Sequence, residues 1–99
     1  MNTIAIKNGE VEIRSAATTG VWLTQNEIAA LFGVFTSAVR ANIRTILQNG
    51  ILREDKVFRR FKTDRGYIER YNLEMIVTLA FRLHSENAET FRRWIIQRA

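Results

Sequence analysis

The stretch TQNEIAALFGVFTSAVRANI, residues 24–43, has the pattern of two short helices joined by a tight turn. Thr24 and Glu27 have the spacing of a capping box, in which each side chain accepts a hydrogen bond from the backbone amide of the other residue. Gly33 is expected to end the first helix, because glycine adopts a left-handed backbone at little cost. A second helix is expected to begin at about residue 36 or 37 and to run to residue 48, where an Asn-Gly pair follows.

The residues inside this stretch have the spacing of a helix-turn-helix, the unit that lays its second helix in the major groove of DNA. Ala29, four residues before Gly33, supplies the small residue needed where the two helices cross. The apolar residues that would fix the crossing angle are Ile28, Phe32, Val34 and Val39. The same spacing occurs in helical hairpins that only build a core, so the pattern leaves open whether this pair reads a nucleic acid.

The outer face of the second helix carries basic and small residues, which favours contact with DNA. Arg40 is the best candidate for a bidentate contact with guanine, and Thr36 and Ser37 are expected to hold a phosphate at the helix start. Basic residues of a hairpin downstream are expected to contact phosphates or to enter the minor groove as a wing. The candidate DNA-binding residues are therefore Thr36, Ser37, Arg40, Ala41, Arg44, Arg59, Arg60, Lys62 and Arg65. For each of them, the alternative is a solvated surface side chain.

Two residues do not fit the helix-turn-helix pattern. Phe35 occupies the turn, where a small polar capping residue is usual, and it is expected either to pack beneath the helices or to be exposed at a protein contact. Asn42 stands where such units are often apolar, beside the apolar Ile43. A slight rotation of the second helix would explain Asn42, and it would shift the groove-facing set by one position.

Two β-hairpins are expected on either side of this stretch. Residues 4–13 alternate apolar and polar side chains around Asn8-Gly9, a pair that tolerates the positive φ of a type I′ turn. Residues 57–71 are rich in strand formers around the turn sequence TDRG, although their alternation is imperfect. The short segment VWL, residues 21–23, either adds a strand or leads directly into the first helix.

Two further helices are expected towards the end of the sequence. Residues 72–83 are a nearly all-apolar segment that Asn72 would cap, so a buried helix is expected there. Residues 85–98 begin at a Ser that can cap a helix, and they place Ala, Phe, Trp and Ile side chains on one face. The expected fold class is therefore α+β, with an N-terminal β-hairpin, a winged helix-turn-helix-like core and two C-terminal helices, in a single domain over residues 1–99.

The charge of the chain is concentrated in its middle third. The 99 residues carry a net charge of +5, and residues 35–70 contain nine basic and four acidic side chains, which accounts for the whole excess. Such a balance suggests a polyanion as partner, although a solvated basic surface has the same composition. The sequence has no Cys, no apolar run of membrane-spanning length and no signal-peptide pattern, so a cytoplasmic protein outside the membrane is expected.

Residues for catalysis or metal binding are few. His84 is the single His and lies between two predicted helices, where it is interpreted as a helix-end residue rather than a base. Glu54 and Asp55 in a predicted loop, and Glu86 and Glu89 on a helix surface, are better explained as solvated side chains than as a magnesium nuclease site. We therefore expect no enzyme activity, no metal and no cofactor.

Two longer blocks of the sequence resemble a known family. VWLTQNEIAALFGV at residues 21–34 and RYNLEMIVTLAFRLHSENAETFRRW at residues 70–94 are similar to blocks of the virulence RhuM family of bacterial proteins. The second block is also similar to the end of the phage Bro-N domain, a DNA-binding module. Phe35 departs from the family, whose members tend to carry Ser there.

The resemblance implies a sequence-specific double-stranded DNA-binding domain, a transcriptional regulator of phage or mobile-element origin. It also implies that the chain is the N-terminal part of a longer protein with a further C-terminal domain. The matched Arg82 and Arg92 are expected to form an ion pair with Glu86 or Glu89 rather than to bind phosphate. A homodimer stays open, because many helix-turn-helix proteins read two half-sites. The alternative function is a protein-interaction or oligomerisation module of an antirepressor-like or toxin–antitoxin-associated protein, with Phe35 and the apolar last helices as its partner surface.

Overall fold

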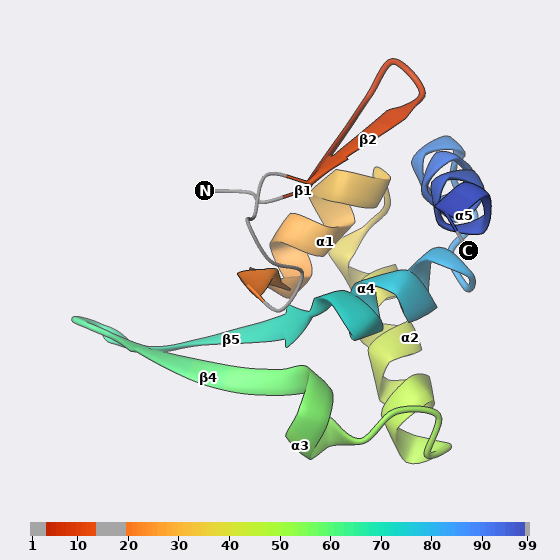
Figure 1. Cartoon of the computed structure of the whole chain (residues 1–99). Helices are drawn as coiled ribbons and strands as arrows, with labels where there is room; N and C mark the ends of the chain where they lie inside the picture. The colour runs from red at the N-terminus through yellow and green to blue at the C-terminus, as the bar shows by residue number, and fades with distance from the viewer. Residues whose placement is uncertain (1–3, 14–19, 99) are drawn as a thin grey trace.

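Helices and strands follow one another along the whole described part of the chain (Figure 1). The computed structural model describes residues 4–13 and 20–98. Its strands are β1 (Ile4–Lys7), β2 (Glu10–Ile13), β3 (Trp22–Leu23), β4 (Phe58–Thr63) and β5 (Gly66–Asn72). Its helices are α1 (Gln25–Phe32), α2 (Thr36–Gln48), α3 (Glu54–Val57), α4 (Leu73–Ala80) and α5 (Glu86–Arg98). The predicted α+β class, with an N-terminal hairpin and helices at the C-terminal end, is confirmed.

The N-terminal hairpin forms as the sequence predicts. β1 and β2 pair antiparallel, and Lys7 lies opposite Glu10 at the turn. Asn8 has φ 53° and Gly9 has φ 76°, the positive values that a type I′ turn requires. The hairpin packs against α1 and α5 and buries Ile4 in the core.

A second sheet joins the segment before α1 to the later hairpin. Its strand order is β3-β5-β4, with all neighbours antiparallel. Trp22 pairs with Asn72 and Leu23 with Tyr71, so the segment before α1 is a strand rather than a simple lead-in. As a result, the hairpin β4–β5 is attached directly to the start of α1.

The imperfect alternation of β4 has a structural reason, because both faces of the hairpin base carry aromatic contacts. Phe58 lies opposite Tyr71, with ring centroids 5.3 Å apart. Phe61, on the other face, meets the edge of Trp22 at 5.7 Å. Burial raises the pKa of the Tyr71 phenol above its ordinary value of 10.0.

Helices α1 and α2 are bounded by the residues that the sequence predicts. The Thr24 amide donates to Glu27 Oε1 at 2.8 Å and the Glu27 amide donates to Thr24 Oγ1 at 3.1 Å, which completes the capping box. Gly33 ends α1 with φ 65°. The two helices then pack through buried residues, among them Ile28, Phe32, Val39 and Ile43.

A short helix, α3, lies where a loop is predicted. Glu54 and Asp55 occupy its first turn, where acidic side chains suit the helix dipole, and Arg53 forms an ion pair with Asp55 at 2.9 Å. Val57, expected in the hairpin, is instead the fully buried last residue of α3. The chain therefore enters the hairpin through a helical turn whose last side chain is part of the core.

Helix α4 begins at its Asn72 cap as predicted but ends at Ala80, three residues before the predicted end at Leu83. Phe81 follows it and is 53% exposed, so the apolar run is not uniformly buried. Beyond this end, Arg92 of α5 donates from its Nη1 to the carbonyl oxygens of Ala80 at 2.7 Å and Leu83 at 3.0 Å. A side chain from another helix thus satisfies acceptors that further helical turns would otherwise use.

The predicted ion pairs of Arg82 and Arg92 with Glu86 or Glu89 are wrong for the part of the chain that the structure describes. Arg92 is committed to the two carbonyl oxygens after α4, and Arg82 Nε donates to Asn42 Oδ1 at 3.1 Å. Both arginines therefore connect elements of the fold through neutral acceptors.

One buried cluster extends from Ile4 to Phe91 and holds these elements together. Phe32 of α1 and Phe91 of α5 meet edge-on at its centre, with ring centroids 5.6 Å apart. Among the helices described, none has the length and apolar character needed to cross a bilayer.

Candidate nucleic-acid interface

The outer face of α2 carries the predicted set of residues. Ser37, Arg40, Ala41 and Arg44 are all exposed, while Val39, Ile43 and Ile46 are buried on the opposite side. The one-position rotation considered for α2 is therefore not present. The 13 residues of α2 include no acidic side chain, and Arg40 and Arg44 have no ion-pair partner among the described residues.

Asn42 is polar for a reason that lies outside α2. It is half-buried, its Nδ2 donates to the Ala38 carbonyl oxygen at 2.9 Å, and its Oδ1 accepts the bond from Arg82. Asn42 therefore links α2 to the segment after α4 and does not belong to the outer face.

The start of α2 lies where the sequence predicts it. Phe35 is the N-cap residue, and it makes no side-chain capping bond. Thr36 is the first helical residue, and its Oγ1 donates to Asn26 Oδ1 of α1 at 3.1 Å. The amides of Thr36 and Ser37 have no hydrogen-bond acceptor within the described residues, so they remain available to an outside acceptor.

Two of the four predicted hairpin residues already have partners in the fold. The Arg59 guanidinium lies 4.7 Å from the centre of the Trp22 ring, a cation–π contact at the hairpin base. Arg60 Nε lies 3.3 Å from Glu69 Oε2 on the neighbouring strand. Both guanidiniums are exposed, but Glu69 offsets part of the positive charge.

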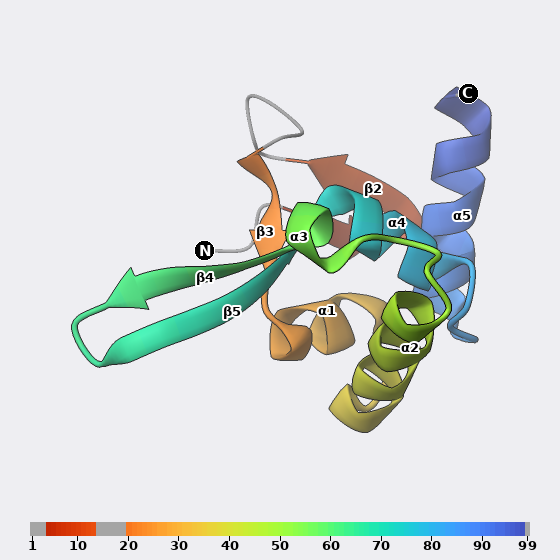
Figure 2. The same cartoon turned by 90° about the horizontal axis from the view of Figure 1, so that it is seen from below.

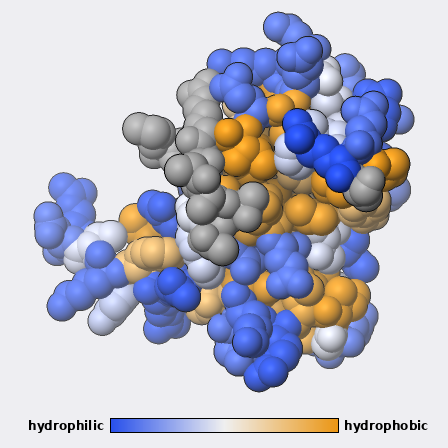
Figure 3. Space-filling view, in the orientation of Figure 1, coloured by the Kyte–Doolittle hydropathy of each residue, from blue (hydrophilic) through white to orange (hydrophobic). Residues whose placement is uncertain are grey.

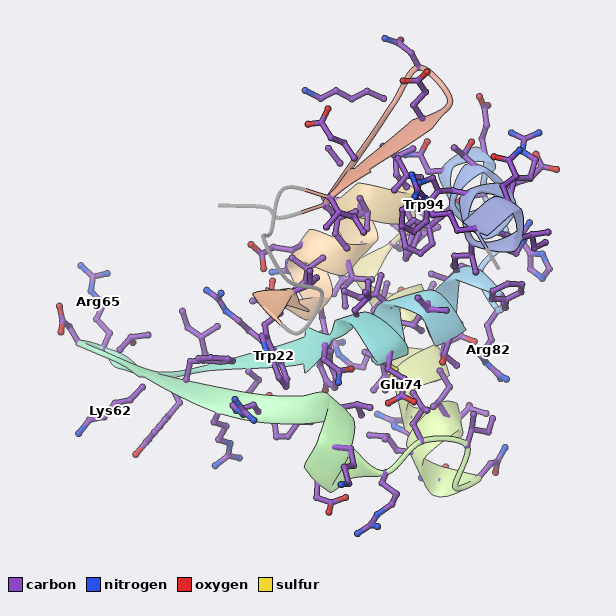
Figure 4. All side chains as sticks on the ribbon, viewed as in Figure 1. Trp22, Lys62, Arg65, Glu74, Arg82 and Trp94 are labelled. Atoms are coloured by element: carbon purple, nitrogen blue, oxygen red, sulfur yellow. The ribbon has the colours of Figure 1, made fainter. Side chains whose placement is uncertain are left out.

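The other two hairpin residues lie near its tip. Lys62 and Arg65 point away from the body of the molecule (Figure 4) and have no ion-pair partner within the described residues. The projecting hairpin is largely hydrophilic along its length (Figure 3). Asp64, between them in the sequence, lowers the net charge of the tip.

The candidate residues form two groups rather than one patch. Hairpin β4–β5 and helix α2 lie on either side of α1 (Figure 2). Arg40 lines a shallow depression together with Asn26 of α1 and with Ile68 and Glu69 of β5, so it faces the hairpin. Lys62 and Arg65 lie at the far end of the hairpin, away from α2.

Two side chains that lie next to the predicted residues were not themselves predicted. Asn26 joins Thr36 and Arg40 at the start of the helices, but its sequence position in the first turn of α1 gives no sign of that contact. Arg70 places its guanidinium 5.5 Å from the centre of the Phe61 ring, on the same face as Arg59. Strand pairing would have indicated Arg70, because it lies directly opposite Arg59 in the register.

Residues 4–13 and 20–98 contain no group of three His, Cys, Asp or Glu side chains placed to hold a metal ion. Comparison of the chain with protein-family models, with curated proteins and with solved structures gives no match. The resemblance to the RhuM and Bro-N proteins therefore stays a prediction from the sequence blocks.

Proposed function

We propose that this domain binds double-stranded DNA sequence-specifically through α2, with α1 and α2 as a helix-turn-helix and hairpin β4–β5 as its wing. One observation carries the proposal: Arg40 and Arg44 stand on an exposed helix face that has no acidic residue and no ion-pair partner among the described residues. Because neither arginine is in an ion pair within the described residues, both guanidiniums are available to phosphate oxygens or to the O6 and N7 of guanine.

The support beneath α2 suits a reading helix. A side chain that recognises a base must be held in place by rigid neighbours. The capping box at Thr24 and Glu27 and the left-handed Gly33 fix how the chain enters α2. Val39, Ile43 and Ile46 then anchor its inner face in the core.

The hairpin is placed to contribute phosphate contacts beside the helix. β3 ends immediately before the cap of α1 and pairs with β5, so the hairpin is held to the helix pair by the sheet. Lys62 and Arg65 point away from the body near the tip of the hairpin and would meet the DNA backbone away from α2. Arg59 and Arg60 have a smaller role in the proposal, because Trp22 and Glu69 already engage them.

Exposed apolar side chains favour the alternative, a protein-interaction module. Phe35 is 83% exposed and Ile96 of α5 is 64% exposed. However, Met75, Ile76 and Leu79 of α4 and Phe91 of α5 are fully buried in the core. Within α4 and α5, Ile96 is the one large apolar residue that is exposed, so the basic face of α2 is the stronger support.

We further propose a role in transcription regulation within a phage or mobile element, with no catalytic activity. The similarity of residues 21–34 and 70–94 to the RhuM and Bro-N blocks is the support for this part of the proposal.

The test is fluorescence anisotropy of a labelled random-sequence duplex, titrated with the domain at several salt concentrations. We expect binding in the micromolar range or weaker, with log K falling by about 0.9 per contacted phosphate for each unit of log salt. The Arg40→Ala/Arg44→Ala variant is expected to bind more weakly and to lower the slope by about 2, because two contacts are lost.

The matched control is Lys7→Ala/Arg93→Ala, which removes two exposed positive charges from the N-terminal hairpin and α5. It should bind nearly as well as the wild type. Equal losses in the two variants would indicate attraction by net charge alone, and the absence of binding at low salt would refute DNA binding by this domain.

A further inference from the structure

The N-terminal end of α2 carries an aromatic side chain that the fold does not use. Phe35 is the N-cap residue, its side chain is 83% exposed, and it makes no capping bond. A Ser or Asp at this position would satisfy a free amide and stabilise the helix by about 1 kcal/mol. A residue that breaks a local rule without a gain in packing is expected where function requires it.

The surroundings of Phe35 are polar, basic or apolar, but not acidic. It lines a surface depression with Ala38 and Asn42 of α2 and with Arg82 and His84 from the segment between α4 and α5. Of the residues that the structure describes, no Asp or Glu contributes to the lining. Next to it, the free amides of Thr36 and Ser37 add positive partial charge at the helix start. This setting favours a polyanion over an uncharged or basic protein surface.

The major groove of DNA offers one apolar group on its base edges, the 5-methyl group of thymine, and Phe is among the side chains that contact it. The N-terminal residues of a recognition helix are the ones that reach the base edges. We propose that Phe35 is a specificity-determining residue that reads a thymine methyl group. This inference rests on the proposed function, and it adds an apolar contact to the phosphate or guanine contacts proposed for Arg40 and Arg44.

The experiment starts from the duplex that the domain enriches from a randomised pool. That duplex is remade with deoxyuridine in place of each thymine in turn, which removes only the methyl group. Anisotropy titrations then compare the wild type, Phe35→Ala and Phe81→Ala. Phe81 is a matched control because it is also an exposed Phe, 53% accessible, but lies outside α2 and the depression.

At one thymine, uracil is expected to weaken wild-type binding roughly four-fold, as the loss of one buried methyl group predicts. Phe35→Ala should bind the thymine and uracil duplexes equally, whereas Phe81→Ala should retain the wild-type preference. Because Phe35 is exposed, the thermal unfolding of Phe35→Ala should match that of the wild type, which excludes a folding defect.

Equal binding of all uracil duplexes by the wild type would overturn the inference while leaving DNA binding intact. Retention of the preference in Phe35→Ala would overturn it as well. If no duplex is enriched and anisotropy stays flat at low salt, the proposed function fails, and the assignment of Phe35 fails with it.

Discussion

The arginines of α2 are free of ion pairs within the described residues, whereas Arg82, just before α5, and Arg92, within α5, form hydrogen bonds inside the fold. Arg40 and Arg44 are exposed and have no ion-pair partner among the described residues. Arg92 donates to two carbonyl oxygens beyond the end of α4, and Arg82 donates to Asn42. An arginine side chain therefore donates hydrogen bonds within the fold in one region, whereas in the other it is exposed and available to a partner molecule.

The difference lies in the acceptors that the fold leaves open. Helix α4 ends early, so its last carbonyl oxygens need donors, and the guanidinium of Arg92 reaches them from α5. The outer face of α2 presents no such acceptor. A count of basic residues therefore overstates how many are available to DNA. The hydrogen-bond and ion-pair partners of each arginine show whether it is engaged within the fold or available to a ligand.

The largest effect is expected from Arg92→Met, which removes both hydrogen bonds to the end of α4. Hydrogen bonds from a charged donor contribute about 1.5–3 kcal/mol each, so the free energy of unfolding should fall by about 3 kcal/mol. In a domain of this size the melting temperature should drop by more than about 10 °C. Thermal and urea unfolding measure both. The exposed neighbour Arg93, changed to Met, should stay within about 0.5 kcal/mol of the wild type.

The next largest effect is expected from Arg40→Ala/Arg44→Ala, which should lower DNA affinity and leave the stability of the fold nearly unchanged. Affinity for an enriched duplex should fall at least thirty-fold, roughly 2 kcal/mol, because a good bidentate base contact is worth about 1–3 kcal/mol. The free energy of unfolding should change by less than about 0.5 kcal/mol for each site. A large loss of stability would show that these arginines also support the fold, which would erase the contrast with Arg92.

A smaller effect is expected at the bond between Arg82 and Asn42. Arg82→Met should cost about 1 kcal/mol in urea unfolding, because Asn42 is left with an unpaired and half-buried oxygen. Asn42→Leu combined with Arg82→Met should recover most of that loss, since replacing both polar partners removes the unpaired group. If the double variant is less stable than either single variant, Arg82 has another role than this bond.

The smallest effect is expected at the exposed ion pair of Arg60 and Glu69. Arg60 is intermediate between the two groups of arginines, because it has a partner within the fold but is exposed to solvent. Glu69→Gln should change the free energy of unfolding by less than about 0.5 kcal/mol, as exposed ion pairs contribute little. It should raise DNA affinity a few-fold at low salt, because Arg60 loses its competing carboxylate and the hairpin loses a negative charge. Unchanged affinity at low salt would place Arg60 outside the contact surface.

Much of the candidate site could be predicted from the sequence, because the outer face of a helix follows from its period. Ser37, Arg40, Ala41 and Arg44 share an exposed face as predicted. What could not be predicted is which basic side chains are already engaged. Trp22 reaches Arg59 only through the pairing of β3 with β5, and Asn42 meets Arg82 across 40 positions of sequence.

The sequence by itself determined the elements whose causes lie within a few residues. The capping box at Thr24, the left-handed Gly33 and the Asn8-Gly9 turn appear as predicted, since each depends on hydrogen bonds or φ values of near neighbours. The tertiary structure alone decided that Val57 ends a short helix and that α4 stops at Ala80. At these two places Val57 is buried in the core, and the guanidinium of Arg92, 12 residues away, donates to the carbonyl oxygen of Ala80. Contacts between residues that are distant in the sequence leave no periodic pattern in the local sequence.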